Sequence, residues 1–259
     1  MFKYICKLMI LLMLITTSCT TISCNSVPWG GGDSARDILP RTSFVKIEKV
    51  LKLKVCNPED LEECFNQTLV SSGSGFVVKN DQDGSYIMTA GHVCDDSDVI
   101  RRFQRPNITI VGNKFLAIDI DKNYHNAKTI KFTMCEDMCI AYVPGLFRPA
   151  VKIAVAEPLQ GDEVLNLAAP LGVFDTQMIP ILHGHFSGYA YEGRAIYTVP
   201  AIGGSSGSAV FNRRGELIGM IHSAHIRFPF LSLSPTHKEV SDYIMTYANR
   251  RALLDALVN

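Results

Sequence analysis

Residues 203–212 read Gly203-Gly204-Ser205-Ser206-Gly207-Ser208-Ala209-Val210-Phe211-Asn212. Small residues give way here to an apolar run, and glycines stand two positions before Ser206 and directly after it. Glycine lets a backbone approach another group closely. A nucleophilic serine needs this setting, because its hydroxyl must be exposed and neighbouring N–H groups must be free to bind an oxyanion. Without a second motif, a polar loop between two strands explains the pattern better.

A second motif, Thr89-Ala90-Gly91-His92-Val93-Cys94, supplies a candidate base for Ser206. A serine hydroxyl is a weak nucleophile until a base accepts its proton, and a histidine, which titrates near neutral pH, is the usual base. The histidine in turn needs a carboxylate that holds its tautomer and stabilises the imidazolium. The two motifs together favour a nucleophilic site over a plain loop.

The candidate carboxylate is Asp137, which precedes the apolar run 138–143, and its rivals are Asp119 and Asp121. We prefer Asp137 because its distance from His92 along the sequence leaves room for several intervening strands. Small cysteines two positions either side of Asp137 would also share its face of a strand. They would flank the carboxylate, which would otherwise be left in water.

The order His92, Asp137, Ser206 is that of the chymotrypsin-like fold, and not that of subtilisins or α/β-hydrolases. On these motifs the chain resembles trypsin-like (chymotrypsin-fold) serine proteases, closest in style to the bacterial HtrA-type and glutamyl-endopeptidase-type members. The segments that carry the resemblance are 73–78, 86–93, 161–164, 169–172, 204–212 and 215–219. They occur in the right order and cover most of the chain from about residue 43 to residue 224.

The resemblance implies an all-β protease domain over 42–259, built from two six-stranded antiparallel β-barrels. The first barrel, about 42–145, would carry His92 and Asp137, and the second, about 150–230, would carry Ser206. Short strand patterns agree with this fold, and they recur at 43–55, 75–80, 86–89, 152–156, 162–168, 178–187, 194–199, 208–212 and 216–222. Thr236 and Glu239 form a capping-box pattern that begins a C-terminal helix over about 236–257. Because the sequence ends there, we expect no PDZ domain, unlike in many HtrA-type enzymes.

The first 24 residues form a separate segment. Lys3 and Lys7 precede the apolar run 8–15, and small polar residues follow, which is typical of a signal peptide and too short for a membrane-spanning helix. Cys19 and Cys24 each resemble a bacterial lipid-attachment cysteine, so membrane attachment through either is an alternative to free release. Residues 25–41, rich in glycine and with two prolines, are expected to be a flexible linker. We therefore expect an exported protein of the cell envelope, periplasm or medium.

The charge balance and the histidine spacing bear on which partners, cofactors and metals to expect. The 25 Lys and Arg residues balance the 25 Asp and Glu residues, so the formal net charge is zero and gives no reason to expect nucleic acid as a partner. The resemblance implies a polypeptide substrate and neither cofactor nor metal. His183 and His185 would share a strand face, but no third metal ligand is suitably spaced nearby. A polar strand face is the better explanation of the pair.

Export also favours oxidised cysteines. Cys56 and Cys64 bracket a short acidic stretch, and they are the first pair that we expect to be bridged. Cys94 lies two residues after the candidate base, whereas Cys135 and Cys139 lie two residues either side of the candidate carboxylate. If base and carboxylate hydrogen-bond, a bridge from Cys94 to one of the two is geometrically feasible. Small buried thiols explain this second group about equally well.

The mechanism implied by the resemblance is acyl transfer through a Ser206-His92-Asp137 triad, with the N–H groups of Gly204 and Ser206 as the oxyanion hole. The resemblance also indicates which residues line the pocket for the side chain before the scissile bond: Pro200, Ala201, His222, Ser223 and Ala224. No acid in this set could pair with a cation, and burying an unpaired lysine would be unfavourable. We expect small or medium apolar side chains there, with an acidic one as the minority alternative if His222 faces the pocket.

The function predicted from the sequence is therefore that of a serine endopeptidase, which hydrolyses peptide bonds through an acyl-enzyme. The alternative from another class is a catalytically silent binding protein of the cell envelope that has kept the protease fold. All three triad residue types are present, which argues against this alternative. A hydrolase that acts on a small ester would use the same acyl chemistry, and this is a third hypothesis for the function.

Overall fold

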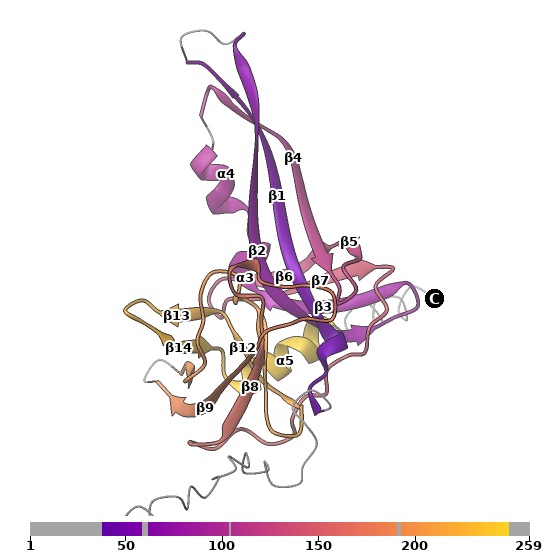
Figure 1. Ribbon diagram of the computed structural model, residues 1–259, viewed down its shortest axis with the longest axis vertical. Helices are drawn as coiled ribbons and strands as arrows, with labels where there is room; N and C mark the ends of the chain where they lie inside the picture. The colour runs from indigo at the N-terminus through magenta and orange to yellow at the C-terminus, as the bar shows by residue number, and fades with distance from the viewer. Residues whose placement is uncertain (1–37, 59–61, 104, 191–192, 249–259) are drawn as a thin grey trace, which may run out of the picture. The chain divides into compact units, whose positions relative to one another are not determined.

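A computed structural model describes residues 38–58, 62–103, 105–190 and 193–248. The expected signal peptide over 1–24, the linker up to residue 37 and the end of the C-terminal helix lie outside these described residues. The fold is mostly β, with two antiparallel sheets of seven strands each (Figure 1).

The first sheet carries the strands of the first expected barrel, in the order β5-β4-β1-β2-β3-β7-β6. Its strands are β1 (Phe44–Cys56), β2 (Cys64–Asn80), β3 (Gly84–Ala90), β4 (Ile108–Ile118), β5 (Tyr124–Asn126), β6 (Lys128–Thr133) and β7 (Met138–Pro144). Two helices follow β3, namely α3 (Gly91–Cys94) and α4 (Ser97–Phe103), and a 3-10 turn, η1 (Arg41–Ser43), precedes β1.

The second sheet has the order β12-β11-β8-β9-β10-β14-β13. Its strands are β8 (Glu163–Leu167), β9 (Ile181–Tyr189), β10 (Ala195–Tyr197), β11 (Ser208–Phe211), β12 (Leu217–Ile221), β13 (Ser223–His225) and β14 (Phe228–Ser234). A 3-10 turn, η2 (Pro170–Gly172), follows β8, and α5 (His237–Tyr247) follows β14. The predicted two-barrel, all-β architecture is confirmed. Each sheet has seven strands where we expected six, because the three-residue segments β5 and β13 extend one edge of each sheet.

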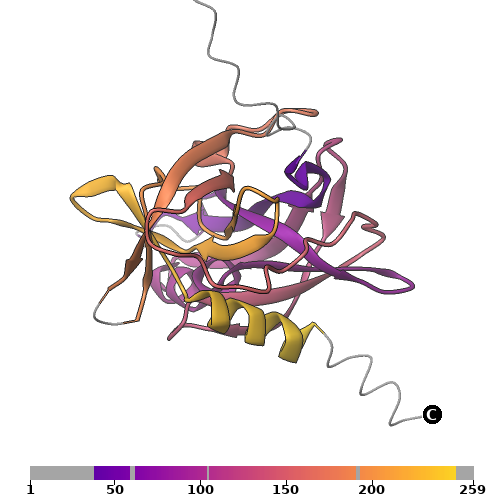
Figure 2. The same cartoon turned by 90° about the horizontal axis from the view of Figure 1, so that it is seen from below.

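The two sheets and α5 share a continuous apolar core. Phe76 and Ile140 of the first sheet, Phe211 of the second and Val240 of α5 belong to the same buried cluster. α5 packs against β7 of one sheet and β12 of the other, on the side seen in Figure 2. Its first turn has the predicted capping box, in which Thr236 accepts a hydrogen bond from the Glu239 N–H. The two sheets are therefore joined through one buried core.

Three strands of the first sheet extend beyond the barrel and form an arm, which we define as residues 48–56 of β1, 64–72 of β2 and 108–116 of β4 (Figure 1). Cys56 pairs with Cys64 in register at the tip of the arm, and a disulfide joins them, as predicted. α4 lies beside the arm. Among the described residues, no helix is long and apolar enough to cross a membrane, and no PDZ domain is seen.

Candidate active site

His92 is the second residue of α3, and α3 directly follows the buried strand β3. β3 pairs with β7 along its whole length, and the pair Ala90–Met138 closes the ladder. This register places the residue before β7, Asp137, beside the residues after β3. Gly91 keeps the two segments close, because a Cβ there would overlap the carbonyl oxygen of Thr133.

Two nitrogen atoms of His92 bind the carboxylate of Asp137. The His92 N–H donates to Asp137 Oδ1 at 2.8 Å, and the imidazole Nδ1 lies 3.0 Å from Oδ1 and 2.9 Å from Oδ2. Since an ionised carboxylate only accepts, Nδ1 carries the proton, and the neutral ring has its lone pair on Nε2. This is the tautomer that a general base needs.

Asp137 lies in the turn 134–137, and not on a strand as we expected. Its φ angle is 55°, a left-handed conformation that aspartate tolerates better than most residues. Strand alternation therefore does not relate Cys135 to Cys139. Cys139 lies on β7 and is bridged to Cys94, whereas Cys135 is an exposed free thiol. The disulfide ties α3 to β7 two residues beyond His92 and Asp137.

A second histidine, His222, contacts the same carboxylate, and its Nδ1 lies 3.4 Å from Asp137 Oδ2. Burial opposes the ionisation of Asp137, but hydrogen bonds from His222 and from His92 outweigh it. Together they hold the pKa of Asp137 well below its ordinary value. The carboxylate is therefore ionised and oriented from two sides.

Ser206 lies in the loop that leads into β11, between two glycines with positive φ angles, 93° at Gly204 and 87° at Gly207. A Cβ at Gly204 would overlap the carbonyl oxygen of Ala169, and a Cβ at Gly207 would overlap that of Ser74. Within the described residues, the N–H groups of Gly204 and Ser206 donate no hydrogen bond. Both are therefore available to a developing oxyanion.

Ser74, a buried residue of β2, holds this loop in place. Its Oγ donates to the Gly204 carbonyl oxygen at 2.8 Å and accepts from the Ala169 N–H at 2.9 Å. Its own N–H donates to the Ser206 carbonyl oxygen at 2.8 Å. Ser74 was not among the predicted site residues, although the Gly-Ser-Gly triplet around it belongs to a segment that carries the family resemblance.

A cavity of about 340 Å³ is lined by His92, Asp137 and Ser206 together. Its other lining residues are Ala201, Ile202, Gly203, Ser205, Ile221, His222, Ser223 and Ala224. Four of the five expected pocket residues are among them, and Pro200 is not. Ile202, which directly follows the expected residue Ala201, and Ile221 are further apolar lining residues, and Ile221 was not predicted. We call this cavity the acyl-side pocket.

The Oγ of Ser206 donates to the His222 carbonyl oxygen at 3.5 Å, and among the described residues no hydrogen bond joins it to His92. Hydrogen bonds between catalytic groups are often long or absent without substrate and tighten when it binds. The structure thus brings His92 and Asp137 into direct contact and places Ser206 in the same cavity.

The rival carboxylates belong to a different part of the first sheet. Arg148 contacts both, with its Nη2 at 2.8 Å from Asp119 Oδ2 and 2.5 Å from Asp121 Oδ2. Neither lines the acyl-side pocket. Both carboxylates bind Arg148, and no interaction of either with His92 is found among the described residues.

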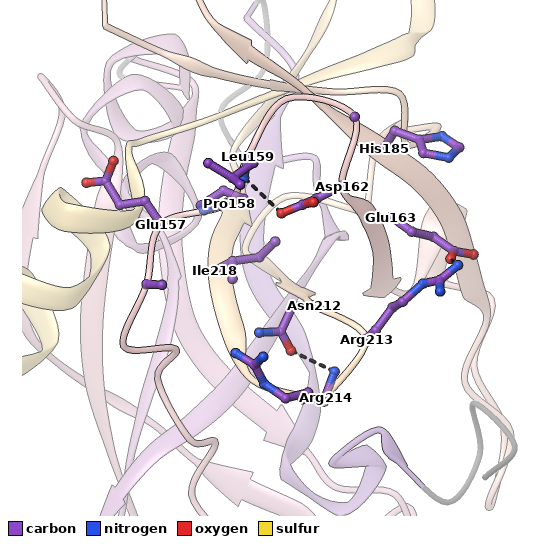
Figure 3. Close-up of a pocket in the computed structure, with 12 residues that line it drawn as sticks. Glu157, Pro158, Leu159, Asp162, Glu163, His185, Asn212, Arg213, Arg214 and Ile218 are labelled. Atoms are coloured by element: carbon purple, nitrogen blue, oxygen red, sulfur yellow. Dashed lines mark hydrogen bonds and ion pairs between the residues drawn. The ribbon is translucent and has the colours of Figure 1, made fainter. Parts of the chain in front are cut away.

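Figure 3 shows a larger cavity, of about 540 Å³, which none of His92, Asp137 and Ser206 lines. Charged side chains of both signs surround it, among them Glu163, Arg213 and Arg214. His185 lines this cavity, while His183 contacts Glu163. Among the described residues, no cluster of His, Cys, Asp and Glu side chains could hold a metal ion.

Known proteins resemble this chain in sequence. Two curated relatives from strains of Pseudomonas putida, each described as a probable periplasmic serine endoprotease DegP-like, are 30% identical to it over 156 residues. The match covers 58% of this chain and 28% of each relative, so it spans little more than a quarter of their length.

Two solved structures share the fold. Rv3671c from M. tuberculosis, in the inactive form of a serine-to-alanine mutant, has a TM-score of 0.56 at 17% identity over 81% of this chain and 88% of that chain. The serine endoprotease from Yersinia pestis has a TM-score of 0.56 at 15% identity over 83% of this chain and 66% of that chain.

A family profile described as the trypsin-like peptidase domain matches residues 73–220, more than half of the sequence. The matched range begins beside Ser74, contains His92, Asp137 and Ser206, and ends in β12. The protein therefore belongs to the trypsin-like peptidase domain family.

Proposed function

We propose that the protein is a serine endopeptidase in which Ser206 is the nucleophile, His92 the general base and Asp137 the carboxylate that orients His92. The observation that carries the proposal is the arrangement in one cavity of the His92–Asp137 pair, the Ser206 hydroxyl and two free N–H groups. Family membership and the two DegP-like relatives support the same chemistry.

The reaction would proceed in two acyl transfers. Ser206 Oγ attacks the carbonyl carbon of the substrate, and its proton passes to Nε2 of His92, while the N–H groups of Gly204 and Ser206 bind the oxyanion. The C–N bond then breaks, and His92 gives the proton to the leaving amine. Water, deprotonated by His92, attacks the acyl-enzyme, and Ser206 recovers its proton as the acid product leaves.

The acyl-side pocket favours small or medium apolar side chains before the scissile bond. Ala201, Ile202, Ile221 and Ala224 give it apolar walls. The carboxylate of Asp137, which also lines it, is already engaged by two histidines. A lysine side chain would therefore be desolvated in the pocket without a free partner, which is unfavourable.

The substrate is proposed to be a polypeptide and the protein to be exported. Two disulfides and the periplasmic relatives support export. Lipid attachment through Cys19 or Cys24 is a further proposal, on residues outside the described part of the chain.

A catalytically silent envelope protein is the alternative function, and one observation favours it: Ser206 Oγ bonds to a backbone carbonyl instead of to His92.

The test is covalent labelling of the purified protein with a fluorophosphonate, followed by peptide mapping. We expect one labelled serine, Ser206, and no labelling or peptide cleavage by Ser206→Ala, because loss of the nucleophile removes several orders of magnitude of rate. Ser241→Ala is the matched control, since Ser241 is a partly exposed serine of α5 outside the acyl-side pocket. If the wild-type protein neither reacts with the fluorophosphonate nor cleaves peptides, the proposal is wrong and the catalytically silent envelope protein is the better interpretation.

A further inference from the structure

A second groove begins at His92 and runs along the arm, with a volume of about 610 Å³. His92 is the one residue that this groove shares with the acyl-side pocket. Next to it the groove is lined by Gly73 and Val93. Farther out the lining is mainly apolar, and the side chains of Leu51, Leu69, Val70, Ile100, Phe103 and Ile110 lie there beside the polar residues Lys49, Asp95, Asp96 and Asn113.

One face of the arm forms the floor of this groove. Ile47, Lys49 and Leu51 alternate along β1, and their register partners on β2 are Gly73, Ser71 and Leu69, which also line the groove. α4, which lies beside the arm (Figure 1), contributes Ile100 and Phe103 to the lining of the groove. The sheet and the helix are tied together by Asp96, which contacts Lys49 and accepts a hydrogen bond from Asn113 at 2.6 Å. The lysine is therefore neutralised, and the groove presents apolar surface.

The groove also follows an unpaired strand edge. β3 pairs with β2 only from Phe76 onward, and the Ser74 N–H donates to the Ser206 carbonyl oxygen. Among the described residues, no strand pairs with the second edge of β2 from Phe65 to Gly73. Residues 69–73 all line the groove. Because side chains alternate across a strand, five consecutive lining residues mean that the groove runs along the edge. An open edge binds an extended peptide through main-chain hydrogen bonds.

The chemistry of His92 decides which part of a substrate lies here. Its imidazole gives a proton to the leaving amine, so the segment after the scissile bond must depart on the His92 side. The acyl-side pocket, beside Ser206, takes the residues before the bond. We propose that the groove along the arm binds the leaving segment of the polypeptide substrate, as an extended strand with apolar side chains, over several residues beyond the scissile bond. This inference rests on the proposed function, since it uses His92 as the acid of the second half-reaction.

The experiment compares two substrate types with the same acyl-side sequence. One type is a peptide that continues with four leaving-side residues, either apolar (Leu-Val-Leu-Val) or polar (Ser-Gln-Ser-Gln). The other is a nitroanilide, which has no leaving-side residues. We expect the apolar leaving segment to raise kcat/KM at least tenfold over the polar one, in the range found for small changes in apolar contact.

Val70→Glu and Val111→Glu form a matched pair of variants. Both valines are exposed on outer strands of the arm, at 60% and 55%, but only Val70 lines the groove. We expect Val70→Glu to lower the ratio of kcat/KM for the apolar peptide to that for the nitroanilide about tenfold, and Val111→Glu to leave the ratio unchanged. Equal ratios in all three proteins, or no preference for apolar leaving segments in the wild type, would overturn the inference.

Two further measurements separate the remaining outcomes. Fluorescence anisotropy of a labelled Leu-Val-Leu-Val peptide, titrated with the wild type and both variants, tests the groove without catalysis. Weaker binding by Val70→Glu alone supports the groove even if labelling of Ser206 fails and the proposed function falls. Light scattering shows whether a second copy occupies the arm instead. A wild-type oligomer that Val70→Glu dissociates would refute substrate binding there.

Discussion

The Nδ1 atom of His222 lies 3.4 Å from Oδ2 of Asp137, so a single carboxylate contacts two imidazole rings. The His222 side chain is buried, and its Nε2 has no hydrogen-bond partner among the described residues. Within the part of the chain that the structure describes, the one polar contact of its side chain is thus with Asp137. His222 lines the acyl-side pocket but turns Nδ1 toward the carboxylate, which makes it a positioning residue as well as a pocket residue.

Replacement of His222 separates these two roles. We expect His222→Ala to lower kcat about tenfold, because a hydrogen bond to a charged group contributes roughly 1.5–3 kcal/mol. His222→Asn should recover most of this loss, since its amide nitrogen can donate from nearly the position of Nδ1. The measurement is kcat and KM for a nitroanilide substrate. If both variants instead raised KM equally and left kcat nearly unchanged, His222 would act only through the shape of the pocket.

Gly204 allows a second test, of the oxyanion loop. At Gly204 the φ angle is 93°, a left-handed conformation that alanine disfavours, and a Cβ would overlap the Ala169 carbonyl oxygen. The loop must therefore move in Gly204→Ala. Gly161 is the matched control, because its φ is 92° but nothing lies within 4 Å of a Cβ built there. We expect Gly161→Ala to lose only about 1 kcal/mol of stability. Gly204→Ala should lower kcat at least a hundredfold, in line with the loss of an oxyanion donor. Similar activities of the two variants would contradict the assignment of the Gly204 N–H.

Much of this site was predictable from sequence because short motifs carry it. The Thr-Ala-Gly-His segment places His92 at the end of a buried strand, and Gly-x-Ser-Gly places Ser206 between two glycines with positive φ. In both cases a short motif sets the local backbone conformation that positions the reactive side chain. Asp137 was found for a partly mistaken reason, because it precedes β7 but lies in a turn and not on the strand.

The features that the sequence did not reveal depend on contacts between distant segments. Ser74 contacts Gly204 across 130 positions of the chain, and nothing in its own neighbourhood specifies that partner. His222 was predicted to line the pocket, but its contact with Asp137 depends on how the two sheets pack. The groove along the arm likewise depends on the position of α4, since α4 contributes Ile100 and Phe103 to its lining.

Asp119 provides a prediction about pH and stability. Burial opposes its ionisation, but hydrogen bonds from Arg148 and Asn123 hold its pKa at about 2, below the ordinary 3.8. A lowered pKa in the folded state contributes stability above the unfolded pKa, and this contribution is lost as the pH falls from about 4 to about 2. Asp119→Asn should therefore lower the free energy of unfolding by about 2 kcal/mol at pH 7, and by progressively less below pH 4.

Urea denaturation of the wild type and Asp119→Asn at pH 7, 4 and 3 would measure this difference. Asp175→Asn is the control, because Asp175 is an exposed partner of Lys122 at 2.5 Å and should contribute little. A difference between wild type and Asp119→Asn that is the same at all three pH values would show that ionisation of Asp119 is not its source.

The two disulfides should differ in what their loss does. Cys94–Cys139 closes a separation of 45 residues and ties the segment after His92 to the segment after Asp137. Cys56–Cys64 closes a separation of 8 residues at the tip of the arm, away from both. Loop-closure entropy assigns the longer loop about 4 kcal/mol and the shorter loop about 2.5 kcal/mol. The larger contrast should be in activity, because only the first bridge fixes the spacing of base and carboxylate.

Double variants with both cysteines of one bridge changed to alanine would test this contrast. We expect Cys94→Ala with Cys139→Ala to lower kcat for the nitroanilide tenfold or more at temperatures where the protein is still folded. The pair Cys56→Ala with Cys64→Ala should retain nearly full kcat, because the arm is anchored by the β1–β2 ladder down to Phe44 and Phe76. Circular dichroism melts run beside the assays would separate unfolding from loss of geometry. If both double variants lost kcat equally while folded, the rigidity of the arm, and not the Cys94–Cys139 tie, would control the His92–Asp137 pair.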